Sequence, residues 1–285
     1  MSFSQHSTEW FDLPEDMRAE GQLFVLSDIH GSADLFASML EVFEARSAPN
    51  LHTRLVLAGD MIDRGPQSLK VLCLAQNAGM RDGFDRVDIL PGNHEAMLLE
   101  AIYGDFSVAA SWVDCYGAGF ARELGLDPLR TSADDLIRAI AAAAPEGLLK
   151  ALDERAGHVR CGDFLIVHAG LLPEQGFVPE KQRTGFLEQP LRGYSSLHWA
   201  WIRDPFLRWT WGWSAYNAGI VIHGHTPEHM GEIASAQEIP AACDRIATHR
   251  RINLDVRACQ FRNLVGLEVI EGRYRFHMIK EKSLK

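Results

Sequence analysis

The sequence predicts an α/β protein built around a parallel β-sheet, and two alternating patterns in its first third support this class. Short apolar runs typical of buried strands occupy residues 23–27, 54–58 and 87–90. Each run is followed by a helical pattern, at residues 32–46, after Pro66 and at residues 94–103. Strands that alternate with helices in this way pair in parallel through right-handed crossovers. Ligands of such sheets bind beyond the carboxyl ends of the strands, where we expect the functional site.

Residues 95–160 differ in character from the flanking sequence. They are rich in alanine and show helical patterns at residues 112–124, 135–144 and 146–155. Because a strand pattern at residues 163–167 follows at once, we interpret this segment as a helical insertion within a single domain of residues 1–285, in preference to a separate helical domain. Further strands are predicted at residues 219–222, 251–254, 264–270 and 273–279, the last two joined in a hairpin by Glu271-Gly272.

Charge and composition argue against a nucleic-acid-binding, membrane-spanning or secreted protein. The net charge of −10 disfavours a nucleic-acid-binding surface, which is normally basic. No apolar run approaches the roughly 20 residues of a membrane span, and the first residues lack the pattern of a secretory signal. The cysteines are widely spaced and odd in number, as expected for reduced thiols in a cytoplasmic protein. They are Cys73, Cys115, Cys161, Cys243 and Cys259.

Five short polar blocks fall at or near the ends of apolar runs. They read Asp28-Ile29-His30-Gly31, Gly59-Asp60-Met61-Ile62-Asp63-Arg64-Gly65, Gly92-Asn93-His94-Glu95, His168-Ala169-Gly170 and His223-Gly224-His225. Any one block is compatible with ordinary hydrogen-bonded residues at the end of a strand. Because the carboxyl ends of parallel strands meet at one edge of a sheet, five such blocks together predict a single shared site.

The residue types in these blocks are those of a two-metal centre. Asp28 and His30 lie two apart on a segment expected to be extended, so both side chains can reach one ion. Asp60 can bridge two ions through its two carboxylate oxygens. The second ion would be completed by Asn93, His168 and His225. Oxygen and imidazole ligands without cysteine favour manganese, with iron or zinc as alternatives, over magnesium or calcium.

The remaining residues of the second and third blocks predict phosphoryl chemistry. Arg64 carries a planar fork of donors that matches phosphate oxygens, although it could instead be a surface residue beside the helix that begins near Pro66. His94 is placed to protonate a leaving oxygen, and Asp63 to orient its imidazole. Two ions would clamp a water and lower its pKa, so hydrolysis needs no covalent intermediate. Glu95 is expected to support its neighbours.

The blocks together resemble the metallophosphoesterases, and specifically the bacterial branch of the phosphoprotein phosphatase family, which is related to calcineurin-like enzymes. The family pattern is D-x-H-G, G-D-x-x-D-R-G, G-N-H-E, H-x-G and a C-terminal G-H, and every element is present. The resemblance runs from about residue 24 to residue 269. It implies a central β-sandwich of two mixed sheets flanked by helices. It places Asp28, His30 and Asp60 on the first metal, and Asp60, Asn93, His168 and His225 on the second.

The same resemblance implies a catalytic set and leaves some residues open. His94 would be the general acid, paired with Asp63, and Arg64 would bind phosphate. Arg203, in a segment similar to the family's W-I-R-x-P-F, would be a second phosphate ligand, against the alternative of a structural ion pair. Asp255-Val256-Arg257-Ala258 stands where relatives often read D-T-G-A. Arg257 could therefore clash with a tight turn or add a positive charge near the site. His223 is expected to be a hydrogen-bonded residue at a strand end.

Three functions remain to be compared. The first is a metal-dependent phosphatase that acts on phosphomonoesters, with phosphoserine or phosphothreonine in proteins as substrate. The second is a hydrolase of symmetrical dinucleoside tetraphosphates such as diadenosine tetraphosphate, which shares the fold and the blocks. A more remote alternative is a non-catalytic relative that only binds partners, but such a protein would be expected to have lost ligands. The tryptophans between residues 199 and 213 could wall a substrate groove or pack in the core, so they do not decide.

Overall fold

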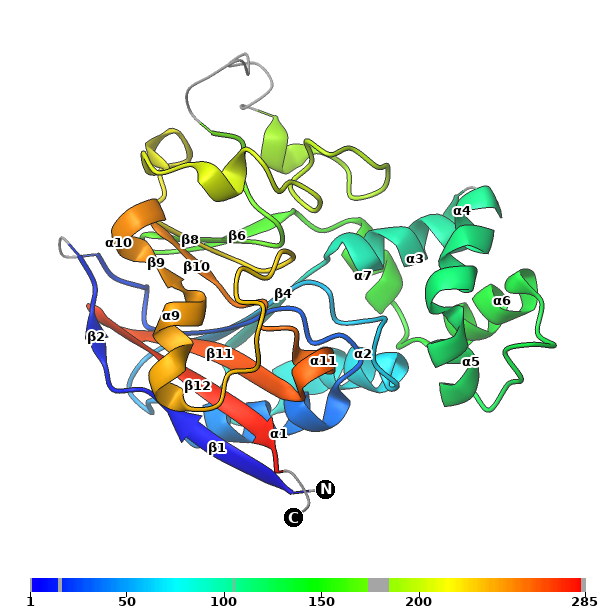
Figure 1. Cartoon of the computed structure of the whole chain (residues 1–285), viewed down its shortest axis with the longest axis horizontal. Helices are drawn as coiled ribbons and strands as arrows, with labels where there is room; N and C mark the ends of the chain where they lie inside the picture. Colours follow the sequence, from blue (N-terminus) through cyan, green and yellow to red (C-terminus); the bar gives the residue numbers. More distant parts are fainter. Residues whose placement is uncertain (1, 15–16, 105, 174–184, 283–285) are drawn as a thin grey trace.

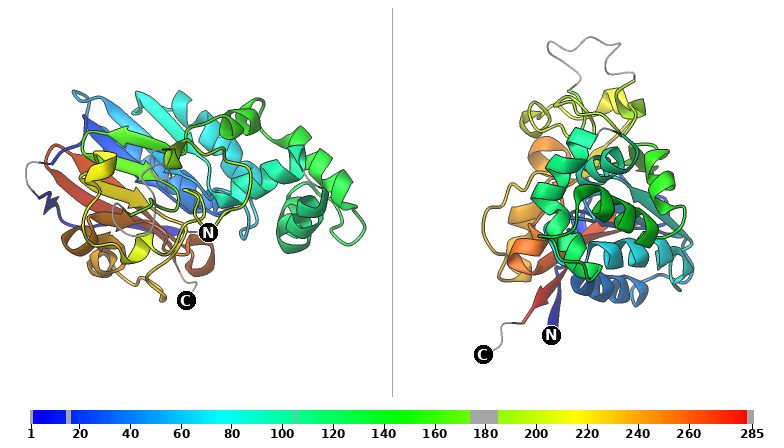
Figure 2. Two further views of the ribbon diagram at one scale, coloured as in Figure 1. Left: turned by 90° about the horizontal axis from the view of Figure 1, so that it is seen from above. Right: turned by 90° about the vertical axis from the view of Figure 1, so that its right-hand side faces the viewer.

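The computed structural model describes residues 2–14, 17–104, 106–173 and 185–282 of the 285-residue chain. Two mixed β-sheets are stacked, with helices on their outer sides and a group of helices to one side of both (Figures 1 and 2). This is the sandwich that the family resemblance implied. Among the described helices, none has both the length and the apolar character needed to cross a bilayer.

The first sheet carries the strands that the opening pattern predicted. Its parallel part consists of β3 (Gln22–Leu26), β4 (Thr53–Ala58) and β5 (Arg86–Leu90). These strands are joined through α1 (Ala33–Glu44), and through α2 (Ser68–Asn77) with the short turn η1 (Ala78–Met80). The sheet continues antiparallel beyond β3 with β11 (Asn263–Ile270), β12 (Arg273–Glu281), β1 (Phe3–Ser7) and the short β2 (Phe11–Asp12). The expected hairpin of the last two long strands is therefore present.

The second sheet is also mixed. Its order is β6 (His158–Cys161), β7 (Phe164–Val167), β8 (Ile220–His223), β10 (Arg251–Asn253) and β9 (Asp244–Arg245). The central strands β7, β8 and β10 are parallel, and the outer strands β6 and β9 pair with them antiparallel. Short helices connect or follow these strands, namely α9 (Ile239–Cys243), α10 (Ile246–His249) and α11 (Ala258–Phe261).

Alternation along β3 explains why the sheets stack. Leu23 and Val25 point into an apolar layer shared with β7 and β8, whereas Phe24 and Leu26 point to the layer covered by α1. All four side chains are fully buried. A central strand buried on both faces reads as a continuous apolar run, which is the pattern seen in the sequence.

The predicted helical insertion consists of a series of short helices. They are α3 (Asn93–Tyr103), α4 (Phe106–Trp112), α5 (Ala118–Glu123), α6 (Ala133–Ala143) and α7 (Leu148–Asp153), with a π-helical turn, η2 (Val113–Gly117), between α4 and α5. Helices α4, α5 and α6 project away from the two sheets (Figures 1 and 2). The helices end before residue 158, where β6 begins, so the last residues of the predicted segment belong to the sheet.

Several elements differ from the expectation. The polar segment before residue 21 was not predicted to hold strands, yet β1 pairs with β12 along its whole length. An exposed edge strand needs no apolar face, so its sequence carries no alternation. The segment after β7 contains short 3₁₀ turns that were not predicted. These are η3 (Phe186–Glu188), η4 (Phe206–Arg208), η5 (Ser214–Tyr216) and η6 (Ala236–Glu238).

Candidate metal centre

The five polar blocks converge where strands of both sheets end. The first three blocks follow β3, β4 and β5, and the last two follow or end β7 and β8. The six predicted ligands are buried, with no more than 5% of any residue exposed. They are Asp28, His30, Asp60, Asn93, His168 and His225.

The loops that carry these residues are not extended. Asp28, His30, Asp60 and His225 all have positive φ angles, between 44° and 67°. The expectation that Asp28 and His30 share a face of an extended segment is therefore wrong, because β3 ends at Leu26 and the chain then turns. Their side chains still meet, with Asp28 Oδ1 3.9 Å from His30 Nε2. Non-glycine residues in this region of φ are strained, and such strain concentrates at functional sites.

Glycine allows the two loops after β3 and β4 to touch. A Cβ atom on Gly65 would collide with the carbonyl oxygen of His30 and with the backbone of Gly31. The loop from the second sheet packs as closely, since a Cβ on Gly224 would overlap the Asp28 carboxylate. Gly65 and Gly224 are thus required by the close approach of these three loops.

Two histidines are oriented by backbone carbonyls. His30 donates from Nδ1 to the carbonyl of Ile62 at 2.8 Å, and His168 donates from Nδ1 to that of Ala58 at 2.8 Å. Since a carbonyl only accepts, both rings carry the Nδ1 proton, and in their neutral form both present the Nε2 lone pair. This is the arrangement found for metal-binding histidines.

The donor atoms form two groups that share one carboxylate. Atoms of His30, Asp60 and His94 lie within 4.8 Å of one another, and so do atoms of Asp60, His168 and His225. Asp60 Oδ2 and His225 Nε2 are buried and have no hydrogen-bond partner among the described residues. Buried polar atoms are rarely left unsatisfied, so these two atoms point to a ligand such as a cation.

The environment of His168 also requires a positive charge. Its Nε2 atom lies 3.2 Å from Asn93 Oδ1 and 3.2 Å from Asp60 Oδ1, both of which are acceptors. Although burial opposes the charged form, the Asp60 and Asp28 carboxylates raise the pKa of His168 to about 9. Either a proton or a metal ion among these atoms would relieve the repulsion. The donor set therefore fits a metal centre.

The surroundings of two other ligand candidates also fit a cation. Burial, with the charges on His168 and Arg203, lowers the pKa of His225 to about 2, so its imidazole is neutral near pH 7. Asp28 accepts from Ser27 Oγ at 2.5 Å and from the His225 backbone N–H at 3.0 Å. Burial and the nearby Asp255 and Asp60 carboxylates raise its pKa. This crowding of carboxylates is what a bound cation would offset.

His94 is held by a carboxylate and by the insertion. Its Nδ1 donates to Asp63 Oδ2 at 2.6 Å, and the same oxygen accepts from Trp112 Nε1 at 3.1 Å. The Tyr116 ring lies edge-on to the imidazole, with centroids 5.0 Å apart. Burial opposes charge on His94, but Asp60 and Asp63 outweigh it and raise its pKa. Trp112 and Tyr116 were missed by the sequence reasoning, because no motif links the insertion to the blocks.

Glu95 supports the loops, as expected. Its carboxylate accepts backbone N–H bonds from Asp60 at 2.9 Å, Met61 at 2.9 Å, Ile62 at 3.2 Å and Gly92 at 2.7 Å. It thereby caps α3 and fixes the second block. His223 is also a hydrogen-bonded strand-end residue, with Nδ1 donating to Gly224 O at 3.0 Å and Nε2 facing Arg251.

A cavity of about 410 Å³ borders the cluster and is rich in arginine. Its lining residues are His30, Arg64, Arg203, His225, Thr226, Pro227, Arg257, Cys259 and Gln260. Arg64 donates from Nη1 to His30 Nε2 at 2.7 Å and from Nη2 to His94 Nε2 at 3.1 Å. Within the described part of the chain, no carboxylate comes within the 4.0 Å ion-pair distance of the guanidinium groups of Arg64, Arg203 or Arg257. The cavity is therefore suited to anions.

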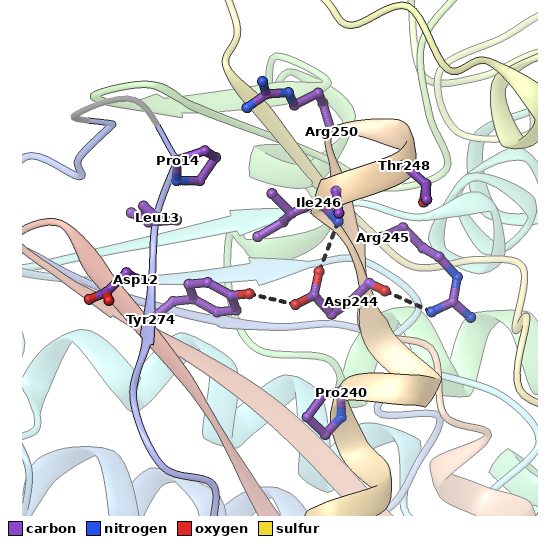
Figure 3. A pocket seen from close by; sticks show the side chains of 11 residues that line it. Asp12, Leu13, Pro14, Pro240, Asp244, Arg245, Ile246, Thr248, Arg250 and Tyr274 are labelled. Atoms are coloured by element: carbon purple, nitrogen blue, oxygen red, sulfur yellow. Dashed lines mark hydrogen bonds between the residues drawn. The ribbon is translucent and has the colours of Figure 1, made fainter.

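A larger cavity of about 510 Å³ lies elsewhere, between the start of the chain and the segment from Pro240 to Arg250 (Figure 3). Its central carboxylate, Asp244, already accepts from the Tyr274 hydroxyl and from the Ile246 N–H. It contains neither of the two metal-type groups found among the described residues. Although this cavity is larger, the smaller cavity beside the donor groups is the candidate functional site.

Comparison with known proteins identifies the class that this fold and site define. A model of the calcineurin-like phosphoesterase family matches residues 22–229. The chain belongs to this family, a result that agrees with the resemblance seen in the motifs. Two solved structures that match the chain show the same fold.

The similarity to individual proteins is more distant. A symmetrical bis(5'-nucleosyl)-tetraphosphatase from Chromohalobacter salexigens is 30% identical over 172 residues, which cover 60% of this chain and 52% of that protein. One from Acidovorax ebreus is 28% identical over 180 residues, covering 59% and 55%. The chain thus spans about half the length of these curated relatives.

Among solved structures, a serine/threonine phosphatase from Saccharomyces cerevisiae has a TM-score of 0.53 and 14% identity, with 94% of this chain and 82% of that chain covered. A cold-active protein-tyrosine phosphatase from a psychrophilic Shewanella has a TM-score of 0.50 and 17% identity, covering 93% and 80%. At these identities the likeness concerns the fold.

Proposed function

We propose that this chain is a metal-dependent hydrolase of phosphoric esters. The observation that carries the proposal is a pair of buried donor groups joined by Asp60, directly beside a cavity lined by three arginines. One ion would be held by Asp28, His30 and Asp60. The second group would hold another through Asp60, Asn93, His168 and His225. We expect manganese, with iron or zinc as alternatives, because the donors are oxygen and imidazole nitrogen.

Bound ions would supply Lewis-acid stabilisation of the phosphate and lower the pKa of an attacking water. The protein's own residues would do the rest. Arg64 and Arg203 would hold the phosphate oxygens and neutralise their charge as it shifts in the transition state. His94, whose pKa is raised, would carry a proton on Nε2 in place of the contact with Arg64 and give it to the leaving oxygen, since its Nδ1 is held by Asp63.

Two substrate classes are candidates. Phosphoserine or phosphothreonine in proteins is the class that the resemblance to the phosphoprotein phosphatases favours. Symmetrical dinucleoside tetraphosphates are the second class, and the names of the two curated relatives favour it. Hydrolysis of either substrate class breaks a P–O bond, and the leaving oxygen takes up a proton.

The proposal is tested by turnover of the manganese-loaded protein. We expect hydrolysis of p-nitrophenyl phosphate and near-complete loss of it in Asp60→Asn, because Asp60 belongs to both donor groups. Parallel assays with a phosphothreonine peptide and diadenosine tetraphosphate would separate the two classes. A protein that binds metal but cleaves none of the three compounds would refute the proposed activity.

A further inference from the structure

Arg257 occupies an unusual backbone position at the wall of the arginine-lined cavity. Its φ angle is 58°, in the left-handed region that favours glycine. The sequence left open whether an arginine here would clash with a tight turn. It does not clash: the turn accepts the residue, which lines the cavity together with Arg64, Arg203 and Gln260.

The backbone around Arg257 is firmly placed. Its N–H donates to Asp255 Oδ1 at 3.0 Å, and the Asp255 N–H donates to Asn253 Oδ1 at 3.1 Å. The flanking Val256 and Ala258 are buried. The neighbouring hydrogen bonds and buried side chains therefore hold Arg257 in its strained backbone conformation. Such strain is typical of functional sites.

The guanidinium of Arg257 has only neutral contacts among the described residues. Nη1 lies 3.5 Å from Gln260 Oε1, and Nη2 lies 3.1 Å from Met230 Sδ. Neither contact neutralises the charge. In a chain with a net charge of −10, a third arginine with no ion-pair partner in one cavity is best explained by an anion that the cavity receives.

We propose that Arg257 is a specificity-determining residue that binds a second phosphate of the substrate, adjacent to the phosphate that is cleaved. This inference rests on the proposed function. Arg64 donates to His30 and His94 and so belongs with the cleaved phosphate, whereas Arg257 makes no contact with the metal-type groups. The substrate class that uses all three arginines is one with linked phosphates, as in a nucleoside polyphosphate.

The test compares Arg257→Gly with the wild type on two substrates. For diadenosine tetraphosphate we expect kcat/KM to fall about tenfold or more, as for loss of a charged hydrogen bond. For p-nitrophenyl phosphate, which has one phosphate, kcat/KM should stay within about twofold. Arg257→Lys should recover part of the lost kcat/KM, because lysine restores the positive charge but not the paired donors of the guanidinium group. Glycine suits the φ angle, so the melting temperature should not fall.

Arg250→Gly is the matched control. Arg250 also has a left-handed φ angle, 52°, but lines the other cavity, so neither substrate should be affected. Equal loss on both substrates in Arg257→Gly would assign the residue to the cleaved phosphate, and no loss on either would remove it from the pocket. Both results would overturn the proposal.

A binding measurement keeps this test separate from the proposed activity. By calorimetry, the wild type should bind α,β-methylene-ADP more tightly than AMP, and Arg257→Gly should abolish that preference. If no substrate is turned over but the preference and its loss are seen, the proposed activity fails while the second phosphate site stands. Equal preference in both proteins would refute the site.

Discussion

His94 is held by parts of the chain that lie far apart in sequence. Asp63 accepts its Nδ1 proton, Trp112 of the insertion shares that carboxylate, and Tyr116 lies against the ring. The same imidazole also lies in a donor group with His30 and Asp60. His94 could therefore act either as a general acid or as a metal ligand, and the two roles can be distinguished.

Replacing His94 separates these roles. If His94 is the general acid, His94→Asn should retain both metal ions and lose about 10²-fold or more in turnover. The loss should be smaller for p-nitrophenyl phosphate, whose leaving group needs little protonation, than for a phosphothreonine peptide. Steady-state rates and metal analysis on the same preparation check this. A stoichiometric loss of one ion would instead identify His94 as a ligand.

Substitution of Glu95 should show how much its hydrogen bonds to the backbone contribute to stability. Glu95→Ala would leave four buried N–H donors without their acceptor, so we expect the free energy of unfolding to fall by about 3 kcal/mol or more. Glu95→Gln keeps one acceptor and should be intermediate. Urea unfolding of the three proteins measures the difference. Equal stability of alanine and wild-type proteins would contradict the capping role.

At the scale of elements, one buried arginine ties the segment that carries Arg203 to the second sheet. Arg251 of β10 is fully buried and donates to the Glu228 carboxylate and to the Leu207 carbonyl, the latter at 2.9 Å. Leu207 in turn donates its N–H to the Arg203 carbonyl at 3.0 Å. The position of Arg203 therefore depends on an ion pair outside the cavity.

This ion pair gives stability a defined pH dependence. Although burial opposes it, bonding to Arg251 lowers the pKa of Glu228 from 4.5 to about 2. The unfolded chain therefore binds this proton more readily. The stabilisation is complete above pH 4.5 and is lost as the pH falls toward 2. Glu228→Gln should lower the melting temperature at pH 7 and flatten its decline between pH 4.5 and 3. Parallel melting curves for both proteins would contradict this.

The sequence predicted some elements well and others not at all, for physical reasons. Central strands such as β3 are buried on both faces, so their apolar runs located them to within a residue or two. The edge strand β1, which reads FSQHS, becomes recognisable only when β12 pairs with it. The motifs located the candidate ligands, but not the left-handed turns at Asp28 and His30 that orient their side chains. The bond from Trp112 to Asp63 joins residues 49 apart, which no local pattern encodes.

At the scale of the whole molecule, the candidate ligands come from loops of both sheets. Asp28 and Asp60 follow strands of the first sheet, whereas His168 and His225 follow strands of the second. Ions bound between them would cross-link the sandwich at one edge. Because such ions bind the folded chain only, they would add to its stability by mass action.

Removing metal should therefore lower the melting temperature. For an ion at about 100 times its dissociation constant, we expect a drop of roughly 5–10 °C after chelation and its return with manganese. Asp60→Asn is the control, because it alters the ligand common to both groups and should respond weakly to either treatment. Differential scanning calorimetry measures the shifts. A wild-type curve unaffected by chelation, with metal loss verified, would contradict the cross-linking role.

The π-helical turn between α4 and α5 has a consequence for how this chain can diverge. It lies between Trp112, which is bonded to Asp63, and helix α5, and it carries Tyr116, which lies against His94. We therefore expect selection to act on this one turn of the insertion. Insertions and deletions should accumulate around residues 125–132, between α5 and α6, and be purged at residues 112–116.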